Sequence, residues 1–487
     1  MLIPLDIPPG VYRNGTAFQS QGRFYDADLW RWFEGTQRPV GGWRRKSGST
    51  VDGVARGIIT WLDNSNQAWT AVGTNEGLYV YTRSGVLHDI TPTGFVAGAA
   101  DSTTGGGYGT GLYGAGIYGA PRADDTNTIP ADVWTLDTWG EYLVACFKGT
   151  IYQWELDTGV VATPLTGAPT AEAILSTEER SMFALGADGN PRRVAWCDLE
   201  DNTDWTATGT NQAGGKNLQT NGKIQCGKRI RNGALIWTDV DVHLATYDGL
   251  PLVYRIERQA TGCGIISKQG AAVTGDGTFW MGANGFWFFN GAVEPLPSDV
   301  GDHVFGDINR SQIAKVSAVH NGQFGEVWWF YPSASSTEID RYVSFNYRER
   351  HWSIGGLVRL CGTDRGVLPY PLMVDADGYL YEHEVGQYRD GRQPYAQSGP
   401  VEMGNGDYTM DVEAYIPDET SLGDVTVSFE VGDWPMSETT TFGPYAAAEK
   451  TDVRFNGRRA AIKFLATADI DFRLGRCRVE AKRGGRR

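Results

Sequence analysis

A short strand pair recurs along the chain, formed by a Gly-centred turn and by aromatic and β-branched residues in alternation. It occurs at residues 73–81, 147–154, 280–289 and 375–381. Self-similarity at a spacing of some tens of residues, carried by strands rather than helices, is typical of radial β architectures. The pattern therefore predicts a β-propeller.

Composition and turn signals agree with this prediction. Aromatic residues make up 12% of the 487 positions and Gly occupies 64 of them, which favours short strands joined by tight turns. Strand clusters of roughly 40 residues follow one another, at 54–92, 131–166, 171–212, 222–262, 267–298, 312–356 and 358–390. Because the repeat is degenerate, we predict an all-β chain with six or seven blades.

Two further regions flank the propeller, which we expect over residues 51–395. Residues 1–50 begin with Pro4, Pro8 and Pro9 and show no early core pattern, so we expect an extended N-terminal arm that docks on another surface. Residues 396–487 contain longer strands with period-two alternation, which predicts an antiparallel β-sandwich-like domain with a basic tail.

A Gly/Tyr-rich loop interrupts the propeller at about residues 99–130. Tyr108, Tyr113 and Tyr118 recur every five residues, each followed by Gly, and such a run suits neither a helix nor a packed strand. Tyrosines on a long loop supply flat contact groups of the kind found at interfaces. We expect an interface role, the alternative being a solvated or self-packed loop.

The charge distribution divides the chain. Its net charge is −15, yet residues 451–487 hold 11 Lys/Arg against 4 Asp/Glu, and the preceding 450 residues carry −22. This pattern indicates an acidic body with one basic docking surface. The basic residues expected at that interface are Arg454, Arg458, Arg459, Arg473 and Arg476.

Motifs for catalysis or cofactor binding are missing from the sequence. It contains neither a phosphate-binding Gly-x-x-x-x-Gly-Lys-Ser/Thr loop nor a Gly-x-Ser-x-Gly nucleophile elbow, and its six cysteines are scattered as small buried hydrophobes would be. Asp239, Asp241 and His243 alternate on one strand face, where they could bind a divalent cation. The favoured interpretation is the solvent face of a blade, so we predict no catalytic, cofactor or metal site.

A sialidase-like glycosidase is the enzymatic alternative, because propellers also house such enzymes. Residues 275–280 resemble a sialidase box once, with the wrong spacing, and Glu178 and Glu179 sit beside Arg180 in an expected turn. We therefore predict a protein that is not an enzyme.

Several segments together resemble the tail nozzle proteins of short-tailed bacteriophages (podophages), also described as hub or packaged-DNA stabilisation proteins. The resemblance lies in residues 3–15, 31–43, the Tyr-Gly loop, 453–459 and 473–475, and by layout it spans most of the chain. None of these segments is a catalytic signature.

The resemblance implies a structural virion protein of the tail, made in the host bacterial cytoplasm. It implies a homo-oligomeric ring, a hexamer, below the adaptor and portal, with tail fibre or spike proteins as further partners and no membrane insertion. DNA retained in the capsid would leave through an acidic lumen that repels its phosphates. We expect the arm and the Tyr-Gly loop to reach across subunits, and the alternative function is that of a receptor- or glycan-binding tail tip.

Overall fold

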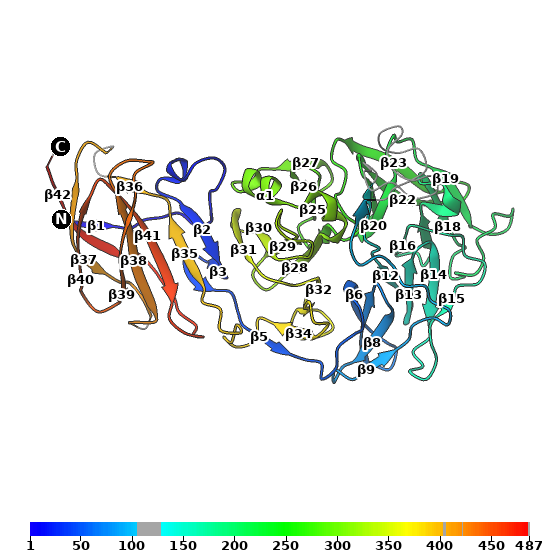
Figure 1. Cartoon of the computed structure of the whole chain (residues 1–487). Coiled ribbons are helices and arrows are strands. Elements are labelled where there is room, and N and C mark those ends of the chain that lie inside the picture. Colours follow the sequence, from blue (N-terminus) through cyan, green and yellow to red (C-terminus); the bar gives the residue numbers. More distant parts are fainter. Residues whose placement is uncertain (105–127, 403–405, 421, 486–487) are drawn as a thin grey trace, which may run out of the picture.

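The computed structural model describes residues 1–104, 128–402, 406–420 and 422–485. Almost all regular structure in them is β-strand, arranged as a propeller and a β-sandwich that lie side by side (Figure 1). The prediction of an all-β propeller with a C-terminal sandwich is confirmed, and the number of blades is seven.

Six of the seven four-stranded antiparallel blades take their strands from consecutive segments of the chain. The first three blades are β6 (Ala55–Leu62), β7 (Ala68–Thr74), β8 (Leu78–Thr82) and β9 (Leu87–Asp89); β12 (Thr135–Trp139), β13 (Tyr142–Phe147), β14 (Thr150–Trp154) and β15 (Thr163–Pro164); β16 (Ala173–Ser176), β17 (Met182–Leu185), β18 (Arg193–Trp196) and β19 (Gly214–Asn217). The next three are β20 (Ile224–Ile230), β21 (Gly233–Thr238), β22 (Asp241–Gly249) and β23 (Val253–Thr261); β24 (Ala271–Val273), β25 (Thr278–Met281), β26 (Phe286–Phe289) and β27 (Val293–Leu296); β28 (Ser317–Asn321), β29 (Glu326–Tyr331), β30 (Arg341–Asn346) and β31 (His351–Gly356).

The seventh blade closes the ring with a strand from the start of the chain. It combines β32 (Cys361–Thr363), β33 (Leu372–Val374) and β34 (Leu380–His383) with β5 (Trp43–Arg45), whose Arg44 pairs with Glu382. The innermost strands of neighbouring blades contact one another around the whole ring, from β6 through β32 and back to β6. The outer strand of this blade thus comes from residues 1–50, the segment that the sequence set apart as an arm.

Aromatic cores between neighbouring blades hold the ring together. Trp69 of the first blade meets Trp154 of the second edge to face, with ring centroids 5.2 Å apart, and Trp237 and Trp280 repeat this contact between the fourth and fifth blades at 5.6 Å. The recurring glycine makes room for such rings, because a Cβ on Gly73 would lie 2.5 Å from the Trp134 side chain. All six cysteines are free and buried, as predicted.

Two sheets form the sandwich, and residues 1–50 contribute to both. One sheet orders β1 (Leu2–Pro4), β42 (Arg478–Arg483), β37 (Met410–Ile416) and β40 (Thr451–Gly457). The other orders β2 (Phe24–Asp28), β35 (Tyr395–Ser398), β41 (Arg459–Ala466), β38 (Val425–Gly432) and β39 (Thr440–Ala446), and β36 (Val401–Glu402) also pairs with β41. The expected arm therefore packs on its own chain rather than reaching across subunits.

Sandwich and propeller share one hydrophobic core at the hairpin of β3 (Trp30–Phe33) and β4 (Thr36–Pro39). Trp30 packs on Phe472 of the sandwich at 4.8 Å, and the same core continues to Trp352 and Phe286 of the propeller. Since one core serves both parts, the chain is built as a single unit rather than as two tethered domains.

Buried charges reinforce this joint. Arg31, only 2% exposed, donates to both oxygens of Glu326 on β29 at 2.7 and 2.8 Å and to both oxygens of Glu384 at 2.6 and 3.1 Å. Burial alone would lower the pKa of Arg31, but the two carboxylates outweigh it and raise this pKa. We call Arg31, Glu326 and Glu384 the Arg31 cluster.

Helices are few in the described residues. They are α1 (Gly301–Asp307) and the 3-10 turns η1 (Ala17–Ser20), η2 (Ala187–Gly189) and η3 (Arg310–Lys315). No helix among these residues has the length and apolar character needed to span a membrane.

Candidate assembly interface

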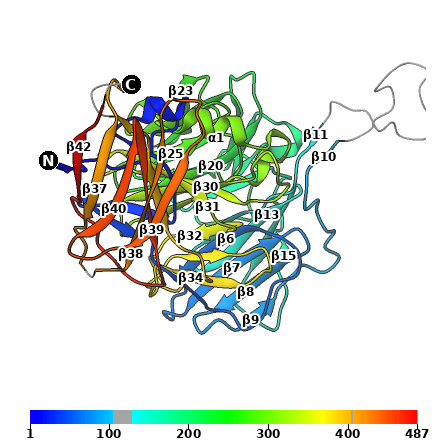
Figure 2. The ribbon, with the colours of Figure 1, turned by 60° about the vertical axis from the view of Figure 1, so that its left-hand side comes forward.

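The Gly/Tyr-rich insertion leaves the propeller between the first and second blades. Its flanks pair as β10 (Thr103–Thr104) and β11 (Thr128–Ile129), which lie at the margin of the propeller away from the sandwich (Figure 2). Tyr108, Tyr113 and Tyr118 lie outside the described residues, so their interface role stays a prediction.

A buried lysine fixes the start of this insertion. The Lys315 side chain is fully buried and contacts the Asp101 carboxylate, the Thr337 carbonyl at 2.6 Å and the Glu338 carboxylate at 3.4 Å. These three acceptors match the three donors of an ammonium group. The charge is thus compensated where it has lost water, as a buried lysine requires.

An arginine from the first blade completes the same site. Arg56 on β6, 2% exposed, donates to the Glu338 carboxylate at 2.5 and 3.3 Å and to the carbonyl of Ala100 at 3.1 Å. Ser102 and Gln312 add two reciprocal hydrogen bonds, at 3.0 and 3.3 Å. Residues 100–102, which we call the insertion base, are therefore clamped between the first and sixth blades.

No local sequence pattern indicates this clamp. Arg56 and Lys315 stand far apart in the chain, each in an ordinary strand or turn context. Arg56 and Lys315 reach the same carboxylate, that of Glu338 in the sixth blade, because the ring closes through contacts of the seventh blade with the sixth and the first.

The structure separates the five predicted arginines into two groups and a single residue. Arg458 and Arg459 lie at the turn between β40 and β41. Arg458 is buried, donates to the Gly406 carbonyl at 2.6 Å and covers the Trp434 ring at 4.7 Å. Arg459 donates to the Ser437 carbonyl at 3.1 Å. Both therefore serve contacts inside the sandwich.

Arg473 and Arg476 form the second group and pair with acids of their own chain. Arg473 pairs with Asp471, and Arg476 lies 3.2 Å from Asp6 with both side chains well exposed. Arg454 on β40 is exposed and has no hydrogen-bond or ion-pair partner among the described residues. The basic surplus of the C-terminal segment is thus partly neutralised within the chain, and Arg454 is the member best placed to meet a partner.

Asp239, Asp241 and His243 do not lie together on one solvent-facing strand face. Asp241 and His243 are buried, with His243 Nε2 3.1 Å from the Asp241 carboxylate, whereas Asp239 lies exposed in the preceding turn. The expectation of a solvent face is therefore wrong, because packing between blades buries this end of β22. Burial lowers the pKa of His243. Among the described residues no group of three or more His, Cys, Asp or Glu could hold a metal ion.

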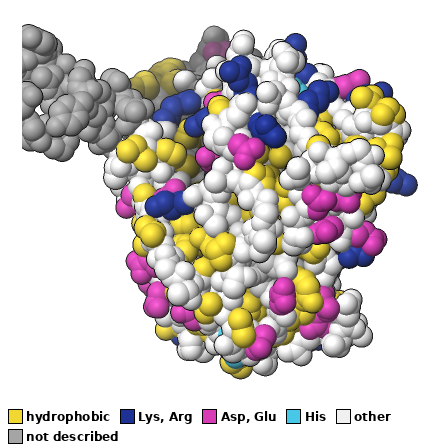
Figure 3. Space-filling model, turned by 90° about the vertical axis from the view of Figure 1, so that its right-hand side faces the viewer, with side chains coloured by type: hydrophobic (Ala, Val, Ile, Leu, Met, Phe, Trp, Pro, Cys, Tyr) yellow, Lys and Arg dark blue, Asp and Glu magenta, His cyan; other side chains and the backbone are white. Residues whose placement is uncertain are grey.

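Charges of both signs cover the propeller face opposite the sandwich. Figure 3 shows acidic side chains spread over this face, with Lys and Arg fewer and mainly near its upper edge. This distribution agrees with a net charge of −15.

No family model and no curated protein matches the chain. Among solved structures it is similar to virginiamycin B lyase from Staphylococcus aureus, at 8% identity over 70% of this chain and 97% of that one, with a TM-score of 0.41. YCF48 bound to a D1 peptide matches at 11% identity over 71% of this chain and 97% of that one, with a TM-score of 0.39. The Neurospora crassa Pan2 WD40 domain matches at 10% identity over 71% and 97%, with a TM-score of 0.40. These likenesses carry no argument about function.

Proposed function

We propose that the chain is a structural subunit of a phage tail, a nozzle or hub that forms a hexameric ring below the adaptor and portal. The proposal rests first on the resemblance of its flanking segments and its Tyr-Gly loop to the podophage nozzle proteins. The observation that carries it is the insertion base. There the buried cations of Lys315 and Arg56 bind Asp101 and the Ala100 carbonyl and so hold the start of a surface insertion in place. A loop that served only as a spacer would not need such an anchor.

In this proposal the insertion contacts the neighbouring subunit. Its tyrosines would bury flat rings at low conformational cost, and a fixed base removes part of the entropy lost on binding. The shared core of propeller and sandwich would let the ring resist internal DNA pressure as one body. The acidic body would repel the phosphates of the passing DNA rather than hold them.

We further propose that the chain works without catalysis. Trp, Tyr and Phe side chains fill the spaces between neighbouring blades, and the charges of Arg31 and Lys315 are paired with carboxylates of their own chain. The lyase named among the structural neighbours does not change this proposal, because the likeness is confined to the fold.

Electron microscopy of the purified full-length chain tests the proposal. We expect closed rings with six-fold symmetry at high protein concentration. A matched variant in which residues 105–127 are replaced by a short Gly/Ser linker keeps the insertion base and should remain monomeric. Trimers that bind glycans would instead favour the tail-tip alternative, and release of sugar would favour a glycosidase.

A further inference from the structure

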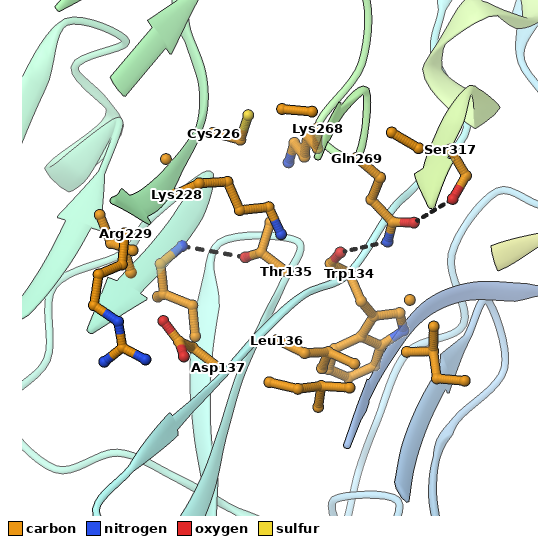
Figure 4. Close-up of a pocket in the computed structure, with 18 of the residues that line it drawn as sticks. Trp134, Thr135, Leu136, Asp137, Cys226, Lys228, Arg229, Lys268, Gln269 and Ser317 are labelled. Atoms are coloured by element: carbon orange, nitrogen blue, oxygen red, sulfur yellow. Dashed lines mark hydrogen bonds between the residues drawn. The ribbon is translucent and has the colours of Figure 1, made fainter. Parts of the chain in front are cut away.

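The axis of the propeller contains a cavity of about 260 Å³ that the proposed function does not use. Its wall is formed by residues of all seven innermost strands, β6, β12, β16, β20, β24, β28 and β32, and by the segment before β24 (Figure 4). The cavity is therefore the central channel of the propeller, shaped by the closed ring and not by a mobile loop.

Three cationic side chains line this channel. Lys228 and Arg229 come from β20, and neither side chain makes a hydrogen bond or a close ion pair among the described residues, although the Asp137 carboxylate attracts both charges. Lys268, from the segment before β24, donates to the Glu172 carbonyl at 2.7 Å and lies 3.2 Å from the Glu172 carboxylate, so that one of its three donors remains free. Figure 4 shows the Lys228 chain extending across the cavity toward Thr135.

One carboxylate in the wall opposes these cations. Asp137 on β12 accepts hydrogen bonds from the backbone N–H groups of Ser176 at 2.7 Å and Thr138 at 2.8 Å, which hold it against the strands. Even when Glu172 is counted as the partner of Lys268, three bases meet two acids, so the channel keeps an excess of positive charge in a chain whose net charge is −15. Like charges confined in a channel repel one another, so the empty site raises the free energy of the folded protein.

Other polar groups of the wall are already engaged. Gln269 donates to the carbonyls of Arg56 at 2.6 Å and Trp134 at 3.2 Å, and its own oxygen lies 3.4 Å from the Ser317 hydroxyl. A ligand would therefore be recognised by the free ammonium and guanidinium groups rather than by amides or hydroxyls.

We propose that the central channel binds a small phosphate-bearing anion of the size of pyrophosphate. Ammonium and guanidinium groups are the side chains that bind phosphate oxygens most strongly, and Arg229 can donate to two oxygens at once. The cavity is smaller than the roughly 300 Å³ at which sites for drug-sized ligands begin, which favours a compact polyanion over a nucleotide. Bound phosphate would relieve the repulsion between the lysines.

Calorimetric titration of the full-length chain with inorganic pyrophosphate at low salt tests this site. We expect one molecule of pyrophosphate bound per chain. The affinity should fall by about tenfold or more in Lys228→Met and in Lys268→Met. The control is Lys223→Met, which removes an exposed lysine just before β20 that does not line the channel and should bind as the natural chain does.

Thermal unfolding without ligand separates a binding role from a structural one. If Lys228 is kept for a ligand, Lys228→Met leaves the melting temperature of the empty protein unchanged or raises it, while the increase caused by pyrophosphate disappears. A lower melting temperature of the empty variant would overturn the proposal, as would equal affinity in the Lys228 and Lys223 variants.

Citrate provides the last comparison. If it binds as tightly as pyrophosphate, the assignment to phosphates is wrong and the channel accepts multivalent anions in general. These titrations do not require a ring, so failure of this site and failure of ring assembly are separate outcomes.

Discussion

Two arginines of this molecule, Arg31 and Arg476, differ in how much they contribute to the stability of the fold. Arg31 is 2% exposed and makes four hydrogen bonds to two carboxylates at the joint between propeller and sandwich. Arg476 of the sandwich makes one side-chain contact, with Asp6, and both partners are more than half exposed. Water screens the exposed pair of Arg476 but not the buried pairs of Arg31. An arginine therefore stabilises the fold at the joint and contributes little to stability on the surface.

The density of basic residues along the chain does not indicate which of them stabilise the fold. The segment 451–487 is dense in basic residues, yet its ion pairs are exposed or half-exposed, as those of Arg476 with Asp6 and of Lys482 with Glu413 are. The cations that organise the fold, Arg31, Arg56 and Lys315, are isolated in sequence. Burial, which the local sequence does not report, decides between the two roles.

The largest effect is expected from Arg31→Met. Removing the guanidinium leaves Glu326 and Glu384 buried beside each other without their counterion, which should lower the free energy of unfolding by about 3–5 kcal/mol. Urea unfolding monitored by tryptophan fluorescence measures it. Combining Arg31→Met with Glu326→Gln and Glu384→Gln removes the stranded charges and should recover much of the loss. A loss of unfolding free energy below about 1 kcal/mol in the single variant would mean that buried Arg31 stabilises the fold no more than an exposed arginine such as Arg476 does.

A smaller loss is expected from Lys315→Met at the insertion base. Glu338 keeps Arg56 as a partner and Asp101 is 56% exposed, so we expect a loss of about 1–3 kcal/mol. The local effect should be clearer than the global one, because the insertion base loses an anchor. Hydrogen exchange at the amide of Ser102 should accelerate in the variant, while amides of β13 stay protected. Unchanged exchange at Ser102 would mean that Lys315 does not hold the insertion.

Glu419 of the sandwich should make the stability of the protein depend on pH. Burial raises the pKa of Glu419 to about 7 from 4.5. A carboxyl whose pKa is higher in the folded state binds more protons when folded, so stability falls as the pH rises from about 4.5 to 7. Since Glu419 is only partly buried, Glu419→Gln should remove about 1–2 kcal/mol of this fall. The measurement compares urea unfolding of both proteins at pH 5 and pH 8, and an equal pH dependence in the two would contradict the shift.

The smallest effect is expected from Arg476→Ala. Its exposed pair with Asp6 should contribute no more than about 0.5 kcal/mol, and this contribution should vanish in high salt. Urea unfolding at low and high ionic strength checks both statements. A loss above about 1 kcal/mol would mean that surface pairs also carry the stability of the sandwich.

Local sequence patterns predicted the propeller well, because six of the seven blades are built from consecutive segments of the chain. The clusters at 54–92 and 131–166, for example, contain the first two blades entirely. Blade number stayed open between six and seven because β5 joins β34 from the far end of the chain, and a repeat search along the sequence does not find such a strand. The period-two pattern placed Asp241 and His243 on one face, but tertiary packing decided that this face is buried. The insertion base and the central channel likewise depend on ring closure.

Native mass spectrometry of the full-length chain tests the central claim most directly, namely that a rigid subunit presents its insertion to a neighbouring copy. We predict that the natural chain has the mass of a hexamer at high concentration, that the variant lacking residues 105–127 has the mass of a monomer, and that Lys315→Met assembles less completely than the natural chain. Assembly of all three proteins to the same extent, or a natural chain that remains monomeric at every concentration, would contradict the account.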